Sequence, residues 1–384
     1  MNDATRQLIQ AIHDSPYQLH LTVAGAGHGA LSALLDVAGA SRTLLEALIP
    51  YHPAAFADFL ERTPFHYVAP ETARLLAGRA FTRARQLVGA EQAVLGVACT
   101  AAIASDRPKR GEHRAHIAIW DATTVTEFTL WLEKGRRSRQ EEEALVGLVI
   151  LNAIAQRCQL TEQLPVTLDA ADRLTSAKID FHTPAAALAT GELHYFGIQA
   201  DGTLYPAETQ PPVILSGSFN PLHQGHLGMA RAAENMLGQP VTFELSAVNV
   251  DKPPLPTALI LARMSQFAGR YPILASDAPT YRLKARLYPG ATFVVGYDTA
   301  VRIFAPRYYE NSAEKMHVAL DEIRALGCRF LVAGRLDEEG IFRSLADVDV
   351  PAAFADLFRA IPESIFRSDI SSTALRAAGA HGAR

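Results

Sequence analysis

The chain has 384 residues, more than one compact core usually holds, so we expect two domains. Hydrophobic residues make up 49% and charged residues 20%, as in ordinary soluble globular proteins. The net charge of −4 excludes the basic excess typical of proteins that bind the nucleic-acid backbone. Any phosphate ligand must therefore be held by local groups, and we expect no nucleic-acid partner.

The three cysteines, Cys99, Cys158 and Cys328, are far apart in the sequence, and none belongs to a Cys-x-x-Cys pair. This pattern argues against a disulfide framework or a zinc knuckle and fits a reducing compartment. The N-terminal residues show no apolar run of signal-peptide length. The most apolar stretch, 144–154, has about half the length of a membrane span. We therefore expect a cytoplasmic protein without a membrane partner.

The first 160 residues alternate between the periodicities of helices and strands. In chain order, the pattern predicts a helix over 6–13, a strand over 20–24, a helix over 29–37, a long helix over 71–87, a buried strand over 93–100, a hairpin of strands over 115–122 and 124–133, and a closing helix over 139–157. This alternation predicts a three-layer α/β domain over residues 1–160.

Residues 161–210 carry several turn signals and are predicted to be a linker with one hairpin, around Gln199 to Gly202. The second domain is predicted over 211–384. Its expected elements are strands over 213–215, 241–246, 291–295 and 328–332, and a helix over 226–237. Strand and helix repeated with short connections predict a Rossmann-like parallel sheet, with ligands at the carboxyl ends of the strands.

A ten-residue segment joins the first strand of the second domain to its helix, and it reads Gly217-Ser218-Phe219-Asn220-Pro221-Leu222-His223-Gln224-Gly225-His226. Gly217 lets the backbone approach a ligand closely. His223 and His226 lie three residues apart at the start of the helix and can point the same way. Imidazoles at the positive end of a helix suit a polyphosphate, since they supply donors for its oxygens.

A second polar segment lies near the end of the chain and reads Ile370-Ser371-Ser372-Thr373-Ala374-Leu375-Arg376. Serine and threonine at the start of a helix offer side-chain and backbone donors. Arg376 follows one turn later and can form a fork of hydrogen bonds to a phosphate.

These two segments, in this order, resemble the hallmark motifs of the nucleotidylyltransferase superfamily, and the resemblance covers about 211–384. It implies that His223 and His226 bind and polarise a nucleoside triphosphate, and that Ser372, Thr373 and Arg376 hold its β- and γ-phosphates. The implied reaction is in-line attack of an acceptor phosphate on the α-phosphorus, without a covalent enzyme intermediate. Mg²⁺ would arrive on the triphosphate, held by phosphates and water, so no protein metal site is expected.

Within the superfamily, Asn220 resembles the nicotinate and nicotinamide mononucleotide adenylyltransferases. Gly296-Tyr297-Asp298 is similar to the strand-Gly-x-Asp element of that branch, which implies that Gly296 and Asp298 lie near the nucleotide. Lys252 falls in a loop that resembles the branch's loop after its second strand, where it would meet a phosphate. The tryptophans that often stack on the pyridine ring are missing after Asp298, and Tyr308 or Tyr309 would have to replace them.

The resemblance thus implies transfer of AMP from ATP to a pyridine mononucleotide, with release of pyrophosphate. Two alternatives stay open at this point. The acceptor is instead phosphopantetheine or an alcohol phosphate, with CTP as a possible donor. Alternatively, the protein binds nucleotides as a scaffold without catalysing a reaction.

Residues 20–157 resemble the C-terminal domain of the CinA family, the nicotinamide mononucleotide deamidases. Ala24-Gly25-Ala26-Gly27 stands where that family has Glu-Ser-Cys-Thr, so the nucleophilic serine is replaced by Gly25. The family's lysine is replaced by Phe56. Because covalent amide hydrolysis needs an activated nucleophile, we expect a domain without deamidase activity. The resemblance also implies a homo-oligomer. The loop over 25–29 is either a nucleotide-binding loop or only a turn from a strand to a helix.

Overall fold

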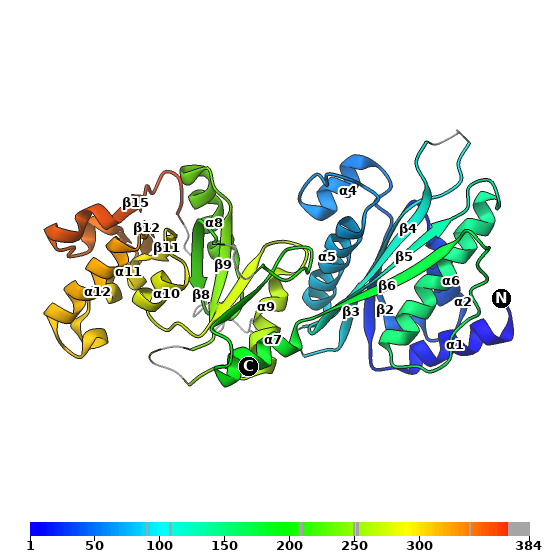
Figure 1. Cartoon of the computed structure of the whole chain (residues 1–384), viewed down its shortest axis with the longest axis horizontal. Helices are drawn as coiled ribbons and strands as arrows, with labels where there is room; N and C mark the ends of the chain where they lie inside the picture. The colour runs from blue at the N-terminus through cyan, green and yellow to red at the C-terminus, as the bar shows by residue number, and fades with distance from the viewer. Residues whose placement is uncertain are drawn as a thin grey trace. The chain divides into compact units, whose positions relative to one another are not determined.

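The computed structural model describes residues 1–89, 91–106, 110–206, 210–248, 250, 253–337 and 339–367. It comprises two compact units, which are shown in Figure 1 and described separately below. The first unit consists of residues 1–182, 198–204 and 265–271. The second unit consists of residues 183–197, 205–264 and 272–384. In the parts of the chain described, no helix is long and apolar enough to cross a membrane.

The first unit is built on a six-stranded sheet with the strand order β2-β1-β3-β4-β5-β6. The strands are β1 Gln18–Ala24, β2 Leu44–Leu48, β3 Val94–Ala102, β4 His113–Trp120, β5 Thr124–Leu132 and β6 Arg173–Asp180. Strand β1 pairs in parallel with β2 and β3, whereas β3, β4, β5 and β6 pair antiparallel in succession. Alternate apolar side chains of β1 (Leu19, Leu21 and Val23) point into the main core of the unit.

Helices cover both faces of this sheet, as Figure 1 shows. They are α1 Asp3–Asp14, α2 His28–Asp36, α3 Ala40–Thr43, α4 Pro53–Leu60, α5 Pro70–Val88 and α6 Arg139–Arg157. Helices α1, α2 and α6 contribute to one core, and α5 packs on the opposite face against β3, β4 and β1. Three layers result, which confirms the predicted α/β class for this part of the chain.

The second unit contains a seven-stranded sheet with the order β15-β12-β11-β8-β9-β10-β7. The strands are β7 Tyr195–Ile198, β8 Val213–Gly217, β9 Val241–Ser246, β10 Ile273–Ser276, β11 Thr292–Gly296, β12 Arg329–Ala333 and β15 Phe358–Ile361. The pairs from β15 through to β10 are all parallel. Numbered from β8 along the chain, these six strands lie in the order 3-2-1-4-5-6, that of the doubly wound Rossmann sheet.

Helices α8 Gln224–Leu237 and α9 Thr257–Met264 follow β8 and β9. Helices α10 Tyr281–Leu287, α11 Tyr297–Ile303 and α12 Ala313–Ala325 contribute with β11 and β12 to an apolar core. Smaller elements complete this unit: the 3-10 helices η2 Pro306–Tyr309, η3 Leu345–Asp347 and η4 Ala352–Leu357, and the two-stranded pair β13 Arg335–Leu336 and β14 Phe342–Arg343. The 3-10 helix η1 Ser265–Phe267 belongs to the first unit.

The segment predicted as a linker, 161–210, has regular structure of its own. Its strand β6 joins the first sheet, helix α7 His182–Thr190 follows, and β7 lies at the edge of the second sheet. The predicted hairpin is present at Gln199 to Gly202: the Gly202 amide donates to the Gln199 carbonyl at 2.9 Å, and Ile198 forms an antiparallel bridge with Leu204.

Candidate active site

The segment from Gly217 to His226 lies where the strand order of the second sheet reverses. Its parent strand β8 is flanked by β9 on one side and β11 on the other. In such a sheet, the helices that follow the strands on one side of this point pack on one face, and those on the other side pack on the opposite face. This leaves a crevice at the carboxyl ends of the strands. The register of β11 against β8, with Val294 opposite Leu215, brings Gly296 to the same edge as Gly217.

His223 and His226 cap helix α8 with one ring nitrogen each. His223 is the N-cap residue, and its Nδ1 accepts a hydrogen bond from the Gly225 amide at 3.1 Å. The Nδ1 atom of His226 accepts from the backbone amide of His223 at 3.3 Å. The two rings stack with their centroids 3.7 Å apart and their planes inclined by 27°. The two imidazoles thus lie side by side because each ring accepts a hydrogen bond from the backbone at the start of α8.

This capping pattern fixes the tautomer of both rings. A nitrogen that accepts from a backbone amide carries no hydrogen, so in each neutral imidazole the proton is on Nε2. Burial lowers the pKa of His223, and burial together with the charge of His223 lowers the pKa of His226 to about 3. Near neutral pH both side chains are therefore uncharged Nε2–H donors. They suit the stabilisation of charge on phosphate oxygens rather than proton abstraction.

Packing and a hydrogen bond from α9 help to hold the loop before the histidines. Phe219 is buried, has a φ of 42° and contacts the ring of His226 edge-on at a centroid distance of 5.1 Å. A Cβ atom on Gly217 would lie 2.8 Å from the Phe219 ring, so glycine is needed there for this close approach. Arg263 of α9 donates to the Ser218 carbonyl at 3.3 Å. Asn220 lies in the turn that follows and is partly exposed.

The predicted Gly-x-Asp element lies at the start of α11. Gly296 is the N-cap of this helix, and Asp298 is in its first turn, exposed to solvent. The Asp298 carboxylate forms an ion pair with Arg335 of β13. It lies at the sheet edge shared with Gly217, and its place near the nucleotide stays a prediction. The remaining predicted residues, Lys252 and the group Ser371, Ser372, Thr373 and Arg376, lie outside the described residues.

A cavity of about 470 Å³ adjoins the first residues of this loop. It is lined by Ser216, Gly217 and Ser218 at the end of β8, by Ser246 at the end of β9, and by α10, α11 and η2. Tyr308 and Tyr309, the proposed substitutes for the missing tryptophans, both line it. The Tyr309 hydroxyl donates to the Ile303 carbonyl at 2.8 Å, which fixes its ring against α11.

The cavity also contains residues that the sequence did not single out. Lys284 of α10 lines it, although only 3% of this residue is exposed. Its Nζ atom donates to both carboxylate oxygens of Glu244, at 2.6 and 2.7 Å, and to the hydroxyl of Ser246 at 3.0 Å. Since an ammonium has three donors, Lys284 has none left for a ligand. Ser246 accepts from it and therefore keeps its own hydrogen available, with no acceptor among the residues described.

In the first unit, the residue at the predicted nucleophile position has a backbone that only glycine adopts comfortably. Gly25 has a φ of 90°, and a Cβ atom there would lie 2.0 Å from the carbonyl oxygen of Ala101. No side chain fits this position without moving β3. Phe56, the residue in place of the family's lysine, is buried in α4.

The amides of the glycine-rich turn are already used within the protein. Gly27 and Gly29 donate to the two carboxylate oxygens of Glu143 at 2.8 and 2.9 Å, and His28 Nδ1 lies 3.0 Å from the same carboxylate. An anionic ligand would have to displace an internal carboxylate from these donors. The contacts favour the turn between a strand and a helix over a nucleotide-binding loop.

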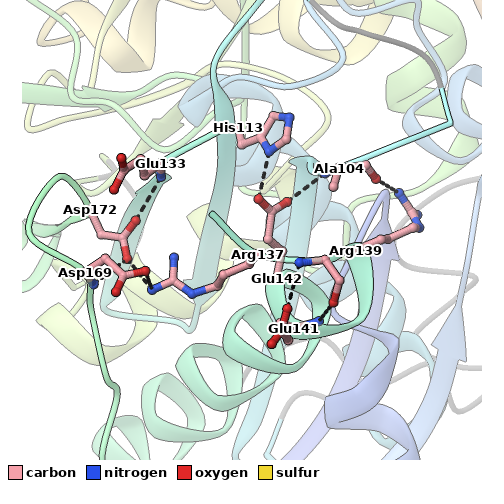
Figure 2. Close-up of polar contacts among 10 residues, drawn as sticks. Ala104, His113, Glu133, Arg137, Arg139, Glu141, Glu142, Asp169 and Asp172 are labelled. Atoms are coloured by element: carbon pink, nitrogen blue, oxygen red, sulfur yellow. Dashed lines mark hydrogen bonds and ion pairs between the residues drawn. The ribbon is translucent and has the colours of Figure 1, made fainter. Parts of the chain in front are cut away.

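Further polar side chains near this turn also bind the backbone, as Figure 2 shows. Glu142 is fully buried, accepts from the Ala104 amide at 2.7 Å and lies 2.7 Å from His113 Nδ1. Arg139 donates to the carbonyls of Ala104 and Gly25 at 2.7 and 3.1 Å. This cluster fixes the loop after β3 to the start of α6.

Comparisons with known proteins found one matching family and several similar solved structures. Residues 214–378 match the family described as cytidylyltransferase-like. No curated protein sequence matches the chain. Similar solved structures include a competence-damaged protein (CinA) superfamily protein from Enterobacter cloacae, at 13% identity and a TM-score of 0.33, with 41% of this chain and 90% of that chain covered. Another is the competence/damage inducible protein CihA from Agrobacterium tumefaciens, at 20% identity and a TM-score of 0.31, with 41% and 94% covered.

The C-terminal part of the chain is thus a cytidylyltransferase-like domain, and its enzyme class is nucleotidylyltransferase. The predicted superfamily is confirmed.

Proposed function

We propose that the second domain transfers AMP from ATP to a pyridine mononucleotide and releases pyrophosphate. The observation that carries the proposal is the stacked pair His223 and His226, whose Nδ1 atoms cap α8 and whose protons are thereby confined to Nε2. This arrangement supplies neutral hydrogen-bond donors at the positive end of a helix, where a polyphosphate binds most favourably.

In the proposed reaction, an oxygen of the acceptor's phosphate attacks the α-phosphorus of ATP in line with the bond to the β-phosphate. A new phosphorus–oxygen bond forms as the α–β bridging bond breaks, and pyrophosphate leaves with the electron pair. The imidazole donors stabilise negative charge that develops on the phosphate oxygens, and no proton need be abstracted from the attacking phosphate.

Mg²⁺ would supply further charge neutralisation and would enter bound to the nucleotide. Within the described ranges no group of three or more histidine, cysteine, aspartate or glutamate side chains is placed to hold a metal ion. In the proposed complex, phosphates and water hold the ion.

Several features of the cavity beside the loop support a pyridine mononucleotide as the acceptor. It adjoins Gly217 and Ser218, so a bound acceptor can present its phosphate to the loop. Its volume of about 470 Å³ lies within the range of small-molecule sites. Tyr308 and Tyr309 supply aromatic surface for a planar ring.

We propose that the first unit has no deamidase activity of the CinA type. Support comes from Gly25, where neither a nucleophilic side chain nor space for one is present.

The test is pyrophosphate release by the purified chain with Mg²⁺ and either ATP or CTP. The acceptors are nicotinamide mononucleotide, nicotinate mononucleotide, phosphopantetheine and glycerol phosphate. We expect release with ATP and a pyridine mononucleotide, and a decrease in kcat of about 100-fold or more in His226→Ala. His317→Ala, an exposed histidine of α12, is the matched control and should retain full activity.

Release with CTP and another acceptor, and none with ATP and either mononucleotide, would contradict the proposal. Nucleotide binding without pyrophosphate release from any acceptor would favour the scaffold alternative. Thermal unfolding of His226→Ala tells whether activity is lost with the phosphate donor or with the structure of the helix start. Losing the helix cap alone costs about 1 kcal/mol of folding stability.

A further inference from the structure

Among the described residues, the charged side chains that line the acceptor cavity are all of one sign. They are Arg282, Lys284 and Arg302, and no described aspartate or glutamate is part of the lining. A ligand with negative charge is therefore favoured there, and one with positive charge is disfavoured.

Two of these three cations are already neutralised by carboxylates that lie behind the cavity wall. Lys284 pairs with Glu244, and the Nε atom of Arg282 lies 2.6 Å from Oε2 of Glu322. The guanidinium of Arg302 has neither an ion pair nor a hydrogen bond among the residues that the structure describes. The uncompensated charge of the cavity thus belongs to Arg302.

Arg302 lines the cavity from α11. Helix α11 begins directly after β11, and Arg302 is six residues beyond Gly296, about 9 Å along the helix axis. Ile303, the next residue of α11, also lines the cavity and accepts a hydrogen bond from the hydroxyl of Tyr309, whereas Ser216, Gly217 and Ser246 line it from the ends of β8 and β9. An acceptor whose phosphate reaches the loop after β8 therefore places its ring near Arg302.

We infer that Arg302 binds a carboxylate on the acceptor's ring, so that the enzyme prefers nicotinate mononucleotide to nicotinamide mononucleotide. This inference rests on the proposed function. A guanidinium forms a charge-assisted fork with a carboxylate, whereas the neutral carboxamide offers only one carbonyl oxygen and no charge. Because Arg302 is exposed, the solvent weakens this preference, and we expect about a tenfold difference in kcat/KM.

The experiment measures kcat and KM for both mononucleotides at saturating ATP, in the wild-type chain and in the variants Arg302→Ala, Arg302→Gln and Arg302→Lys. Arg359→Ala is the matched control, since Arg359 is an exposed arginine of β15 without a side-chain partner among the described residues and outside the cavity lining. We expect Arg302→Ala and Arg302→Gln to raise KM for nicotinate mononucleotide about tenfold and to raise KM for the nicotinamide form much less. Arg302→Lys should keep part of the preference, because it keeps the charge.

A wild-type enzyme that prefers the nicotinamide form overturns the inference, and so does a preference that survives in Arg302→Ala and Arg302→Gln. In both results the proposed function stands, because a pyridine mononucleotide is still adenylylated. Failure of the proposed function has a different signature: neither mononucleotide supports pyrophosphate release, and another acceptor does. The inference then falls with it.

Discussion

Lys284 and Glu244 form an ion pair in the interior of the second domain, with Nζ 2.6 Å from Oε1 and the two residues only 3% and 0% exposed. The pair joins α10 to β9. Ser276 donates to the same Oε1 at 2.5 Å, and Ser246 accepts the third hydrogen of the ammonium. Burying two charges is costly, and the full set of hydrogen bonds offsets much of that cost. The network fixes Ser246 at the wall of the acceptor cavity.

Replacing Lys284 by methionine should destabilise the protein strongly. The variant leaves the Glu244 carboxylate buried without a counter-charge, for which we expect a loss of about 3–5 kcal/mol in the free energy of unfolding. Chemical denaturation measures the loss. The double variant Glu244→Gln with Lys284→Met should recover most of it, because the amide is neutral and still accepts from Ser276. A double variant no more stable than the single one would show that the charge imbalance is not the cause.

Ser246→Ala should weaken acceptor binding and also lower the folding stability. The hydroxyl has a hydrogen available at the cavity, and a hydrogen bond to a charged ligand contributes about 1.5 kcal/mol or more. We therefore expect KM for the acceptor to rise about tenfold, while KM for the nucleotide stays near its wild-type value. The free energy of unfolding should fall by about 1–3 kcal/mol, because the variant removes the acceptor of one hydrogen of the buried Lys284 ammonium. Ser344→Ala, at the cap of η3, is a control outside the cavity. Unchanged acceptor KM in Ser246→Ala would remove this residue from the binding site.

The imidazole of His226 should remain neutral down to unusually low pH. Burial and the neighbouring His223 lower its pKa to about 3 from the ordinary 6.5. Nitrogen chemical shifts of the ring, followed by NMR between pH 8 and 4, should show an Nε2–H tautomer throughout. Protonation of His226 between pH 6 and 7 would contradict the capping arrangement.

The same depression of the pKa makes folding sensitive to acid. The unfolded chain binds a proton at His226 below about pH 6.5, and the folded chain does not. The contribution of His226 to folding stability is therefore complete above that pH and is lost as the pH falls toward 3. His226→Gln should show a smaller decrease in stability than the wild type between pH 6.5 and 4.5, measured by denaturation at each pH.

Restoring a serine at position 25 should not create a deamidase. Gly25→Ser places a side chain at a φ of 90° and against the Ala101 carbonyl. We expect a loss of about 2–4 kcal/mol in the free energy of unfolding and no ammonia release from nicotinamide mononucleotide. Gly89→Ser is the control, since Gly89 also has a φ of 90° but no atom within 4 Å of its Cβ position. Deamidation by Gly25→Ser would show that the rest of that catalytic site is intact.

The helices with strong local signals could be predicted almost to the residue. The predicted helix over 139–157 has the same bounds as α6. Its first residues are recognisable in the sequence, since Ser138 and Glu141 have the spacing of a capping box and form one in the structure. Strands β10 and β15 were not predicted. Each has four residues, too few for a periodic pattern, and each becomes a strand only by pairing in parallel with β9 or β12.

The candidate site also has features that the sequence predicts and features that it does not. The direction shared by His223 and His226 follows from their spacing at the start of a helix, so local sequence predicts it. The Lys284–Glu244 pair joins residues forty positions apart, and no local pattern connects them. One signal was available: Glu244 interrupts the apolar strand over 241–246, and an acid in a parallel sheet covered on both faces requires a buried partner.

Gly25 limits which substitutions the first domain can accept in evolution. A single codon change at this position introduces a Cβ atom 2.0 Å from the Ala101 oxygen, so a side chain can be gained there only together with a shift of β3. Among related sequences, a residue other than glycine at this position should therefore occur together with a different path of the strand that corresponds to β3.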